Sequence, residues 1–360
     1  MSWYDNTNYY INNTKLAQIL VHNKGLCALP SDNWEDYIFD YEVGRTKRRN
    51  HIYSRALLYT EDQTAERDEL DITPFDMAVA DAINTVWITK NRRTFTIGAI
   101  HHIMTGHRSK SLSAGKRDRI ISSIEKLCRI NIIIDCIDEL AKRGMKESSL
   151  IEGPFLSLKK NYKSQEGSVN SNEKDIASNH ITSYEVIEHM PLYKYAGLIH
   201  QFVITPAYIM NIDDNLQSYD DVILLRRELY RKIALLRYPK NNYNNDEIQY
   251  IYSDSKGHTK GLLVDIGLAE SDIADPSLIS SIHNKTLSVL ESLKREASNA
   301  IDTNDPFILG YEILGDYKTP IGVRVEYLPA NNYRIRISNF GHKYDTITGE
   351  KVTKEDISDK

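Results

Sequence analysis

The 360-residue sequence predicts an α+β protein in which two successive groups of helices each end in a β-hairpin. Three observations predict this class: amphipathic helical periodicity, β-branched runs that follow it, and a polar stretch that separates the two groups. That stretch, residues 159 to 180, is rich in Ser, Asn, Lys and Glu and nearly without apolar periodicity. We therefore expect two domains with the same order of elements.

The first strong helix is expected after Asp71, with Thr73 as its N-cap and Pro74 at its first helical position. Apolar residues then recur at helical spacing, namely Phe75, Ala78, Val79, Ala82, Ile83, Val86 and Trp87. A second helix follows the apolar segment at residues 95 to 97, and a turn at residues 105 to 110 leads to a third helix opened by Ser113. Helix, basic turn and basic helix are typical of a helix-turn-helix.

A β-hairpin is expected after the third helix. Ile130 to Ile137 is β-branched enough for a buried strand, Lys142-Arg143-Gly144 makes a polar connection, and Leu150 to Leu158 can return as the antiparallel partner. Three helices followed by a hairpin make a winged-helix domain.

The second half repeats this order. Strands are expected at Tyr184 to Met190 and Gln201 to Ile204, and a helix at Val222 to Tyr238. A loop and short helix near Asp246 to Tyr252 and a long helix from Pro276 to about Ile301 come next, before a hairpin of Phe307 to Leu314 with Ile321 to Leu328. The sequence thus predicts two tandem winged-helix domains.

The predicted organisation has five parts. Residues 1–50 form an N-terminal extension, 51–160 the first winged-helix domain, 161–182 a linker or long wing, 183–330 the second winged-helix domain, and 331–360 a C-terminal tail.

Positive charge is concentrated in one region. The chain carries a net charge of −5, yet the stretch from Lys90 to Arg129 holds ten Lys or Arg against only Asp118 and Glu125. Cations in the first turn of a helix oppose its macrodipole, so Lys116 and Arg117 favour an anionic partner over a purely solvated face. This pattern indicates double-stranded DNA as the partner.

The third helix would lie in the major groove, with the wing along the flanking backbone. Candidates on the helix are Lys116, Arg117, Arg119, Ser122 and Lys126. Phosphate contacts are expected from the turn residues Arg108, Ser109 and Lys110 and from Arg92 and Arg93, which flank the helix, and also from Lys142 and Arg143 of the wing.

In the second domain the long helix presents Ser277, Ser281, Asn284 and Lys285, a polar set able to read base edges. Arg226 and Arg227 add a basic patch on the preceding helix, which could equally be the solvent face of an amphipathic helix.

Enzymatic and membrane functions are not indicated. Gly115-Lys116-Arg117 lacks the first glycine and the Ser or Thr of a P-loop. Cys27, Cys128 and Cys136 form no CxxC pair, which favours structural thiols over a metal site. No apolar run of membrane-spanning length and no signal peptide occurs, so we expect a cytoplasmic protein that is not an enzyme and needs no cofactor or metal.

The sequence resembles the plasmid and mobile-element replication initiators of the double winged-helix kind, particularly a group from Gram-positive bacteria. The resemblance is carried by residues 72–83 (ITPFDMAVADAI), Phe95-Thr96, Met104-Thr105-Gly106, residues 123–127 running into 133–135, residues 191–196 and residues 224–233. It spans about residues 70 to 330 and contains no catalytic signature. It implies binding to repeated sites at a replication origin and a switch between dimers and monomers, and leaves open which host helicase or primase is recruited.

Two alternatives remain. One is a winged-helix transcriptional repressor. The other is a protein-interaction module in which the apolar face from Phe75 to Trp87 extends into a dimer interface while the charge only solubilises the protein.

Overall fold

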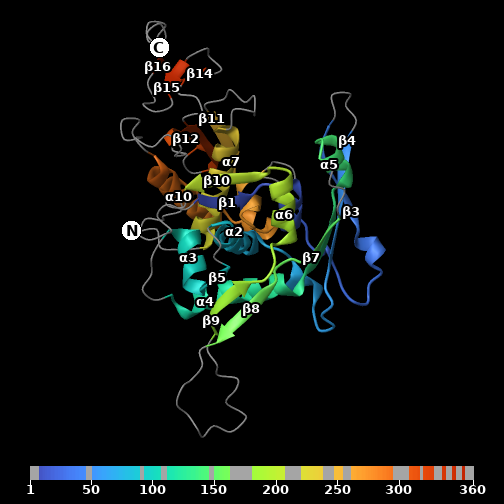
Figure 1. Cartoon of the computed structure of the whole chain (residues 1–360). Helices are drawn as coiled ribbons and strands as arrows, with labels where there is room; N and C mark the ends of the chain where they lie inside the picture. The colour runs from blue at the N-terminus through green and yellow to red at the C-terminus, as the bar shows by residue number, and fades with distance from the viewer. Residues whose placement is uncertain are drawn as a thin grey trace. The chain divides into compact units, whose positions relative to one another are not determined.

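The structure is a computed structural model, and its described residues are 8–45, 51–89, 93–106, 112–145, 150–162, 181–206, 220–237, 247–253, 261–294, 308–316, 319–327, 335–337, 343–345 and 351–352. The chain forms two compact units. Figure 1 labels helices and strands of both. The first unit comprises residues 12–104 and 108–202, and the second unit comprises residues 1–11, 105–107 and 203–360. Helices and strands occur in both, which confirms the predicted α+β class.

Three helices form the centre of the first unit. They are α2 (Pro74–Ile88), α3 (Ile97–Thr105) and α4 (Ala114–Arg129), as the periodicity predicts. Thr73 and Asp76 make a capping box at the start of α2, which satisfies backbone N–H groups that have no partner within the helix. Thirteen of the fifteen residues of α2 are buried, so the apolar face proposed for a dimer interface packs inside the chain.

A five-stranded sheet joins these helices. Its strands run in the order β2 (Cys27–Ala28), β4 (His51–Tyr59), β6 (Asn131–Asp135) and β7 (Ile151–Pro154), and β3 (Phe39–Arg45) also pairs with β4. The β2–β4 pairing is parallel and the others are antiparallel. The first 50 residues, predicted as an extension, thus supply two strands of this sheet and the helix α1 (Lys15–His22).

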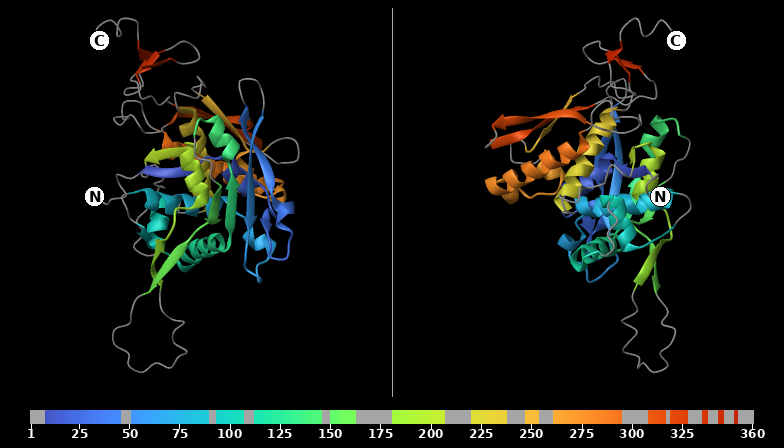
Figure 2. Two further views of the ribbon diagram at one scale, coloured as in Figure 1. Left: turned by 45° about the vertical axis from the view of Figure 1, so that its right-hand side comes forward. Right: turned by 90° about the vertical axis from the view of Figure 1, so that its left-hand side faces the viewer.

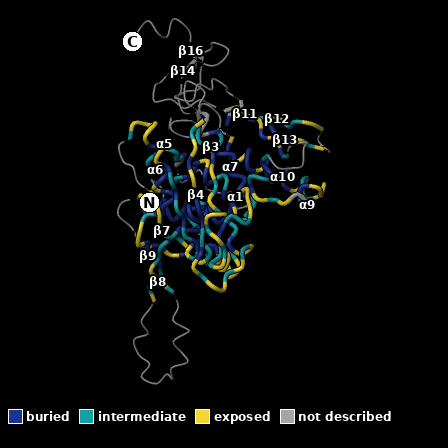
Figure 3. Tube along the Cα trace, turned by 90° about the vertical axis from the view of Figure 1, so that its right-hand side faces the viewer, coloured by how far each residue is buried: buried dark blue, intermediate teal, exposed yellow. Residues whose placement is uncertain are grey.

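The hairpin predicted between residues 130 and 158 is only partly correct. Its strands β6 and β7 do pair antiparallel, with Ile134 opposite Ile151. The connection is not a simple polar turn, because residues Ile137–Lys142 form helix α5, which exposes most of its residues (Figure 3). Asp138 and Glu139 in its first turn complement the helix dipole and favour a helix start at this point.

A second hairpin of the first unit contains the polar stretch. Strand β8 (Leu158–Tyr162) pairs antiparallel with β9 (Ile181–Val186), and β9 pairs with the short β5 (Thr94–Phe95). Figure 2 shows β8 and β9 side by side. Residues 163–180 lie outside the described residues, but they connect two paired strands of one unit. The unit continues through helix α6 (Pro191–Leu198) to Phe202, so the division between units falls there.

Strand β10 (Phe202–Pro206), most of which belongs to the second unit, pairs with β1 (Asn8–Asn12). Its helices are α7 (Asp220–Arg237), α8 (Leu262–Asp265), α9 (Glu270–Ile273) and α10 (Pro276–Leu293). Strands β12 (Ile308–Asp316) and β13 (Thr319–Tyr327) form the predicted hairpin. The predicted tail contains a small sheet of β14 (Ile335–Ile337), β15 (Lys343–Asp345) and β16 (Lys351–Val352).

The short helix predicted near residues 246–252 is wrong. Strand β11 (Glu247–Ile251) occupies this segment and pairs antiparallel with β13 over five residues. Ile248, Tyr250 and Tyr252 alternate with polar residues or an exposed isoleucine, which is the period of a strand.

The two units share an order of elements. In each, a helix, a strand, one or two shorter helices and a long helix precede a hairpin. The strand after the first helix pairs with the last strand of the hairpin, as β5 with β9 and β11 with β13. The first unit differs because β6, α5 and β7 are inserted between the long helix and the hairpin. None of the helices in the described part of the chain combines the length and apolar character needed to span a membrane.

Candidate nucleic-acid interface

Helix α4 is held against α2 by a buried polar cluster. Lys126 Nζ lies 2.8 Å from Asp76 Oδ2 and donates to the Asp71 carbonyl at 2.9 Å. Ser123 Oγ donates to the other carboxylate oxygen of Asp76. The apolar side of α4, with Ile120, Ile124 and Leu127, is buried. Lys126 is therefore positioned by the protein's own carboxylate.

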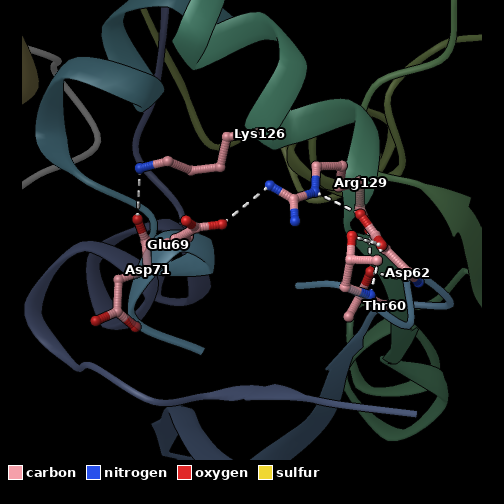
Figure 4. A network of polar contacts seen from close by, with 7 residues as sticks. Thr60, Asp62, Glu69, Asp71, Lys126 and Arg129 are labelled. Atoms are coloured by element: carbon pink, nitrogen blue, oxygen red, sulfur yellow. Dashed lines mark hydrogen bonds and ion pairs between the residues drawn. The ribbon is translucent and has the colours of Figure 1, made fainter. Parts of the chain in front are cut away.

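The last turn of α4 is fixed as well (Figure 4). Arg129 Nε lies 2.8 Å from Asp62 Oδ2, and its Nη1 lies 3.3 Å from Glu69 Oε2. The Thr60 hydroxyl donates to the Arg129 carbonyl at 2.7 Å, which satisfies a carbonyl at the helix end. These contacts orient the whole helix.

The outward face of α4 carries charges of both signs. Arg117, Asp118, Ser122 and Glu125 are exposed, and Lys116 is half-buried. Arg119 is exposed, and its guanidinium carbon lies 4.5 Å from the centre of the Phe75 ring, a cation–π contact. No other described residue forms an ion pair with Arg117, so its charge is available to a ligand.

The β8–β9 hairpin lies beside this face. Lys160 Nζ is 3.2 Å from Glu125 Oε1, which joins β8 to α4. Burial alone would lower the pKa of Lys160, but the contact with Glu125 raises it, so the side chain stays cationic. Lys159 is exposed and makes no ion pair with any residue of the described ranges. Neither lysine is among the residues predicted from the sequence, because the hairpin expected between residues 130 and 158 was the predicted wing.

The buried side of this hairpin is aromatic. The Tyr184 ring of β9 stacks on Phe95 of β5, with 5.6 Å between the ring centres. Burial raises the pKa of the Tyr184 hydroxyl, while Lys160 and Arg117 act in the opposite direction. Arg117 is thus close enough to β9 to affect the pKa of this hydroxyl.

Arg143 stabilises the inserted segment formed by β6, α5 and β7. Its Nη2 lies 2.9 Å from Oε1 of the buried Glu139, and its Nη1 donates to the Ile199 carbonyl at 3.4 Å. The hydroxyl of Tyr195 donates to Glu139 Oε2 at 2.7 Å, and Ser54 donates to the same oxygen at 3.1 Å. Lys142, at the end of α5, is exposed.

At the other predicted phosphate positions, Arg93 is exposed with its guanidinium carbon 4.8 Å from the centre of the Trp87 ring. Trp87 also stacks on His189, whose pKa is lowered first by burial and then by Lys194. Arg92, Arg108, Ser109 and Lys110 lie outside the described residues.

In the second unit, Asp275 caps α10 by accepting from the Ser277 backbone N–H at 2.8 Å. Ser277, Ser281 and Asn284 are exposed along this helix, whereas the Lys285 ammonium pairs with Asp221. Arg226 and Arg227 of α7 are only 3% and 5% exposed, and Arg227 pairs with Glu228. The predicted basic patch on α7 is therefore not a surface feature at these two positions.

Comparisons with known proteins give a limited result. No family model matches the chain, and no curated protein matches it. A crystal structure of selenomethionine derivatives of domains 2 and 3 of RctB is similar at a TM-score of 0.39 and 12% identity, covering 86% of this chain and 96% of that one. A second crystal structure of RctB domains 2 and 3 has a TM-score of 0.36 and 13% identity, with coverages of 84% and 94%. At these values the function must be argued from the chain's own residues.

Proposed function

We propose that the chain is a sequence-specific double-stranded DNA-binding protein built from two winged-helix domains, one in each unit. The observation that carries the proposal is the shared strand pairing. The strand between the first two helices pairs with the last hairpin strand in both units, β5 with β9 and β11 with β13. Helix, strand, helix, helix and hairpin, closed by this pairing, is the winged-helix arrangement, with β8–β9 and β12–β13 as the wings.

The charge distribution supports a phosphate-bearing ligand. In a helix-turn-helix the recognition helix enters the major groove, and here that helix is α4. Arg117 on α4 and Lys159 on the neighbouring wing are exposed cations without ion pairs among the described residues. Such cations gain most from phosphates, since binding releases the counterions condensed on DNA.

We further propose that the DNA is a set of repeated sites at the replication origin of a plasmid or integrative element. The support is the sequence resemblance to replication initiators between residues 70 and 330. The proposal includes no catalytic step and no cofactor. A homodimer and a host helicase or primase are the further partners that this role requires.

Fluorescence anisotropy tests DNA binding. Wild-type protein should bind duplexes from the DNA flanking its own gene more tightly than random duplexes, with strong salt dependence. The variant Arg117→Ala/Lys159→Ala should bind at least tenfold more weakly. The control Lys15→Ala/Lys24→Ala removes two exposed lysines at or near α1 and should bind as wild type does. Negligible binding by the wild-type protein would contradict the proposal.

A replication assay separates an initiator from a repressor. The gene and its flanking DNA are placed on a carrier that has no origin of its own. An initiator maintains this carrier in cells and loses that ability in the Arg117→Ala/Lys159→Ala variant. A repressor binds the same DNA in vitro and does not maintain the carrier.

A further inference from the structure

The exposed face of α10 is uncharged over most of its length. Ser277, Ser281, Asn284 and Ser288 are all exposed and recur at spacings of four, three and four residues, which places them along one side of the helix. Residues of the opposite side, Ile282, Val289 and Leu293 among them, are buried. This uncharged stripe contrasts with the outward face of α4, where Arg117, Asp118 and Glu125 are charged.

Within the stripe, Asn284 has the most available hydrogen-bonding groups. The Ser277 hydroxyl donates to Asp275 Oδ1 at 2.7 Å, and the Ser288 hydroxyl donates to the Asn284 carbonyl at 3.0 Å. In the described part of the chain, no residue hydrogen-bonds to the side-chain amide of Asn284. Its NH₂ donor and its oxygen acceptor therefore both face solvent.

The exposed and half-buried Lys and Arg side chains that the structure describes in the second unit each pair with a carboxylate of that unit. Lys232 pairs with Asp265, Lys285 with Asp221, Lys294 with Glu291 and Arg324 with Glu312. These are the half-buried and exposed Lys and Arg residues of that unit whose side chains the structure describes. The first unit, by contrast, has Arg117 and Lys159 available for phosphates.

We propose that α10 reads base edges through uncharged hydrogen bonds, with Asn284 as the residue that selects an adenine, while the first unit supplies most of the phosphate neutralisation. The inference rests on the proposed function. An amide presents a donor and an acceptor side by side, which matches the N7 acceptor and N6 donor of adenine in the major groove. Guanine presents two acceptors there, so the amide is satisfied at only one of them.

In vitro selection of duplexes from a random library tests this inference with full-length protein. The wild-type consensus should contain an adenine whose replacement by guanine weakens wild-type binding by about tenfold or more. Asn284→Ala should lose the preference at that position and keep the rest of the consensus. Asn33→Ala is the matched control, because it removes an exposed asparagine side chain in the first unit and should leave the consensus unchanged.

Two further measurements sharpen the result. Replacing the selected adenine by 7-deazaadenine removes N7 and should weaken binding of the wild-type protein but not of Asn284→Ala. The log–log salt slope should be the same for both proteins, since a neutral side chain releases no counterions. An unchanged consensus for Asn284→Ala, or a shallower slope, would overturn the inference. Absence of any consensus for the wild-type protein would overturn the proposed function itself.

Discussion

The ammonium group of Lys126 lies 2.8 Å from Oδ2 of Asp76, and this ion pair joins α4 to the first turn of α2. The Asp76 side chain is only 4% exposed and also accepts hydrogen bonds from Ser123 and Thr73. One cation from the basic stretch thus neutralises a buried carboxylate and sets the orientation of the helix that carries the other cations.

Lys126→Ala should lower the free energy of unfolding by about 1–3 kcal/mol, because it leaves the buried Asp76 carboxylate with hydroxyl and backbone donors but no cation. Urea denaturation followed by circular dichroism measures this change. Arg117→Ala, on the exposed side of the same helix, is the control and should shift stability by no more than about 0.5 kcal/mol. Equal stability of both variants would contradict the assignment of Lys126 to the helix junction.

The log–log salt slope of DNA binding should report the number of phosphate contacts. Six contacts across both units would give a log–log slope of about −5. Arg117→Ala and Lys159→Ala should each make this slope shallower by about 0.9, on specific and random duplexes alike. Anisotropy across a salt series measures the slope, and Lys15→Ala provides a variant of equal charge change. A loss of affinity confined to one duplex sequence would indicate base readout instead.

Alkaline pH should destabilise the first unit through Tyr195. Its pKa is raised far above the ordinary value of 10.0, first by burial and then by Tyr41 and Glu139. The folded protein therefore keeps this proton at pH values where the unfolded chain has lost it. Its contribution to stability is complete below pH 10 and is lost as the pH rises above that value, by about 1.4 kcal/mol per pH unit.

Tyr195→Phe should make that alkaline loss less steep, although it also lowers stability at neutral pH by about 1–3 kcal/mol because Glu139 loses a hydrogen bond. Ser54→Ala is the matched control, since it removes another hydrogen bond to the same carboxylate oxygen without removing a titrating group. Urea titrations between pH 8 and about 11 compare the free energies of unfolding of wild type and both variants. This range extends past 10.0, the ordinary pKa above which the contribution of Tyr195 is lost. An unaltered slope in Tyr195→Phe would show that Tyr195 does not cause the effect.

Gly322→Ala should destabilise the sheet formed by β11, β13 and β12. A Cβ at this position would lie 2.3 Å from the Tyr250 carbonyl oxygen on β11, so the two backbones would have to move apart. We expect a loss of about 1–3 kcal/mol in the free energy of unfolding. Gly310→Ala in the adjacent β12 is the control, because the nearest atom would be the flexible carboxylate of Glu326 at 3.9 Å. Similar losses for both variants would contradict this account.

Helices α2, α3, α4, α7 and α10 could be predicted because each carries its own local signal. The apolar period of α2, its Thr73 cap and Pro74 all lie within one segment. The β8–β9 hairpin of the first unit could not be predicted this way, since its strands are separated by residues 163–180 and their third partner β5 is two residues long. Pairing of that kind depends on contacts far apart in the sequence, which local propensity does not report.

The candidate site, too, could be predicted only as far as local sequence patterns allow. The pattern correctly placed Arg117 and Ser122 on the exposed side of α4 and Asn284 on the exposed side of α10. It also predicted outward positions for Arg226 and Arg227, which are buried, because helical periodicity shows where apolar residues point and not what covers the polar side. Lys126 and Arg143 carry the charge that the sequence reports, but Asp76 and Glu139 determine how that charge is used.

The first residue of the inserted strand β6 pairs with the last residue of the inserted strand β7. Asn131, two residues after the end of α4, lies opposite Pro154, and the Phe155 N–H donates to the Ile130 carbonyl at 2.7 Å. The two ends of the inserted segment therefore lie next to each other. These backbone contacts help to hold the end of α4 next to the segment that leads into β8. The inserted residues thus add to the sheet without lengthening the path through the structure from α4 to β8.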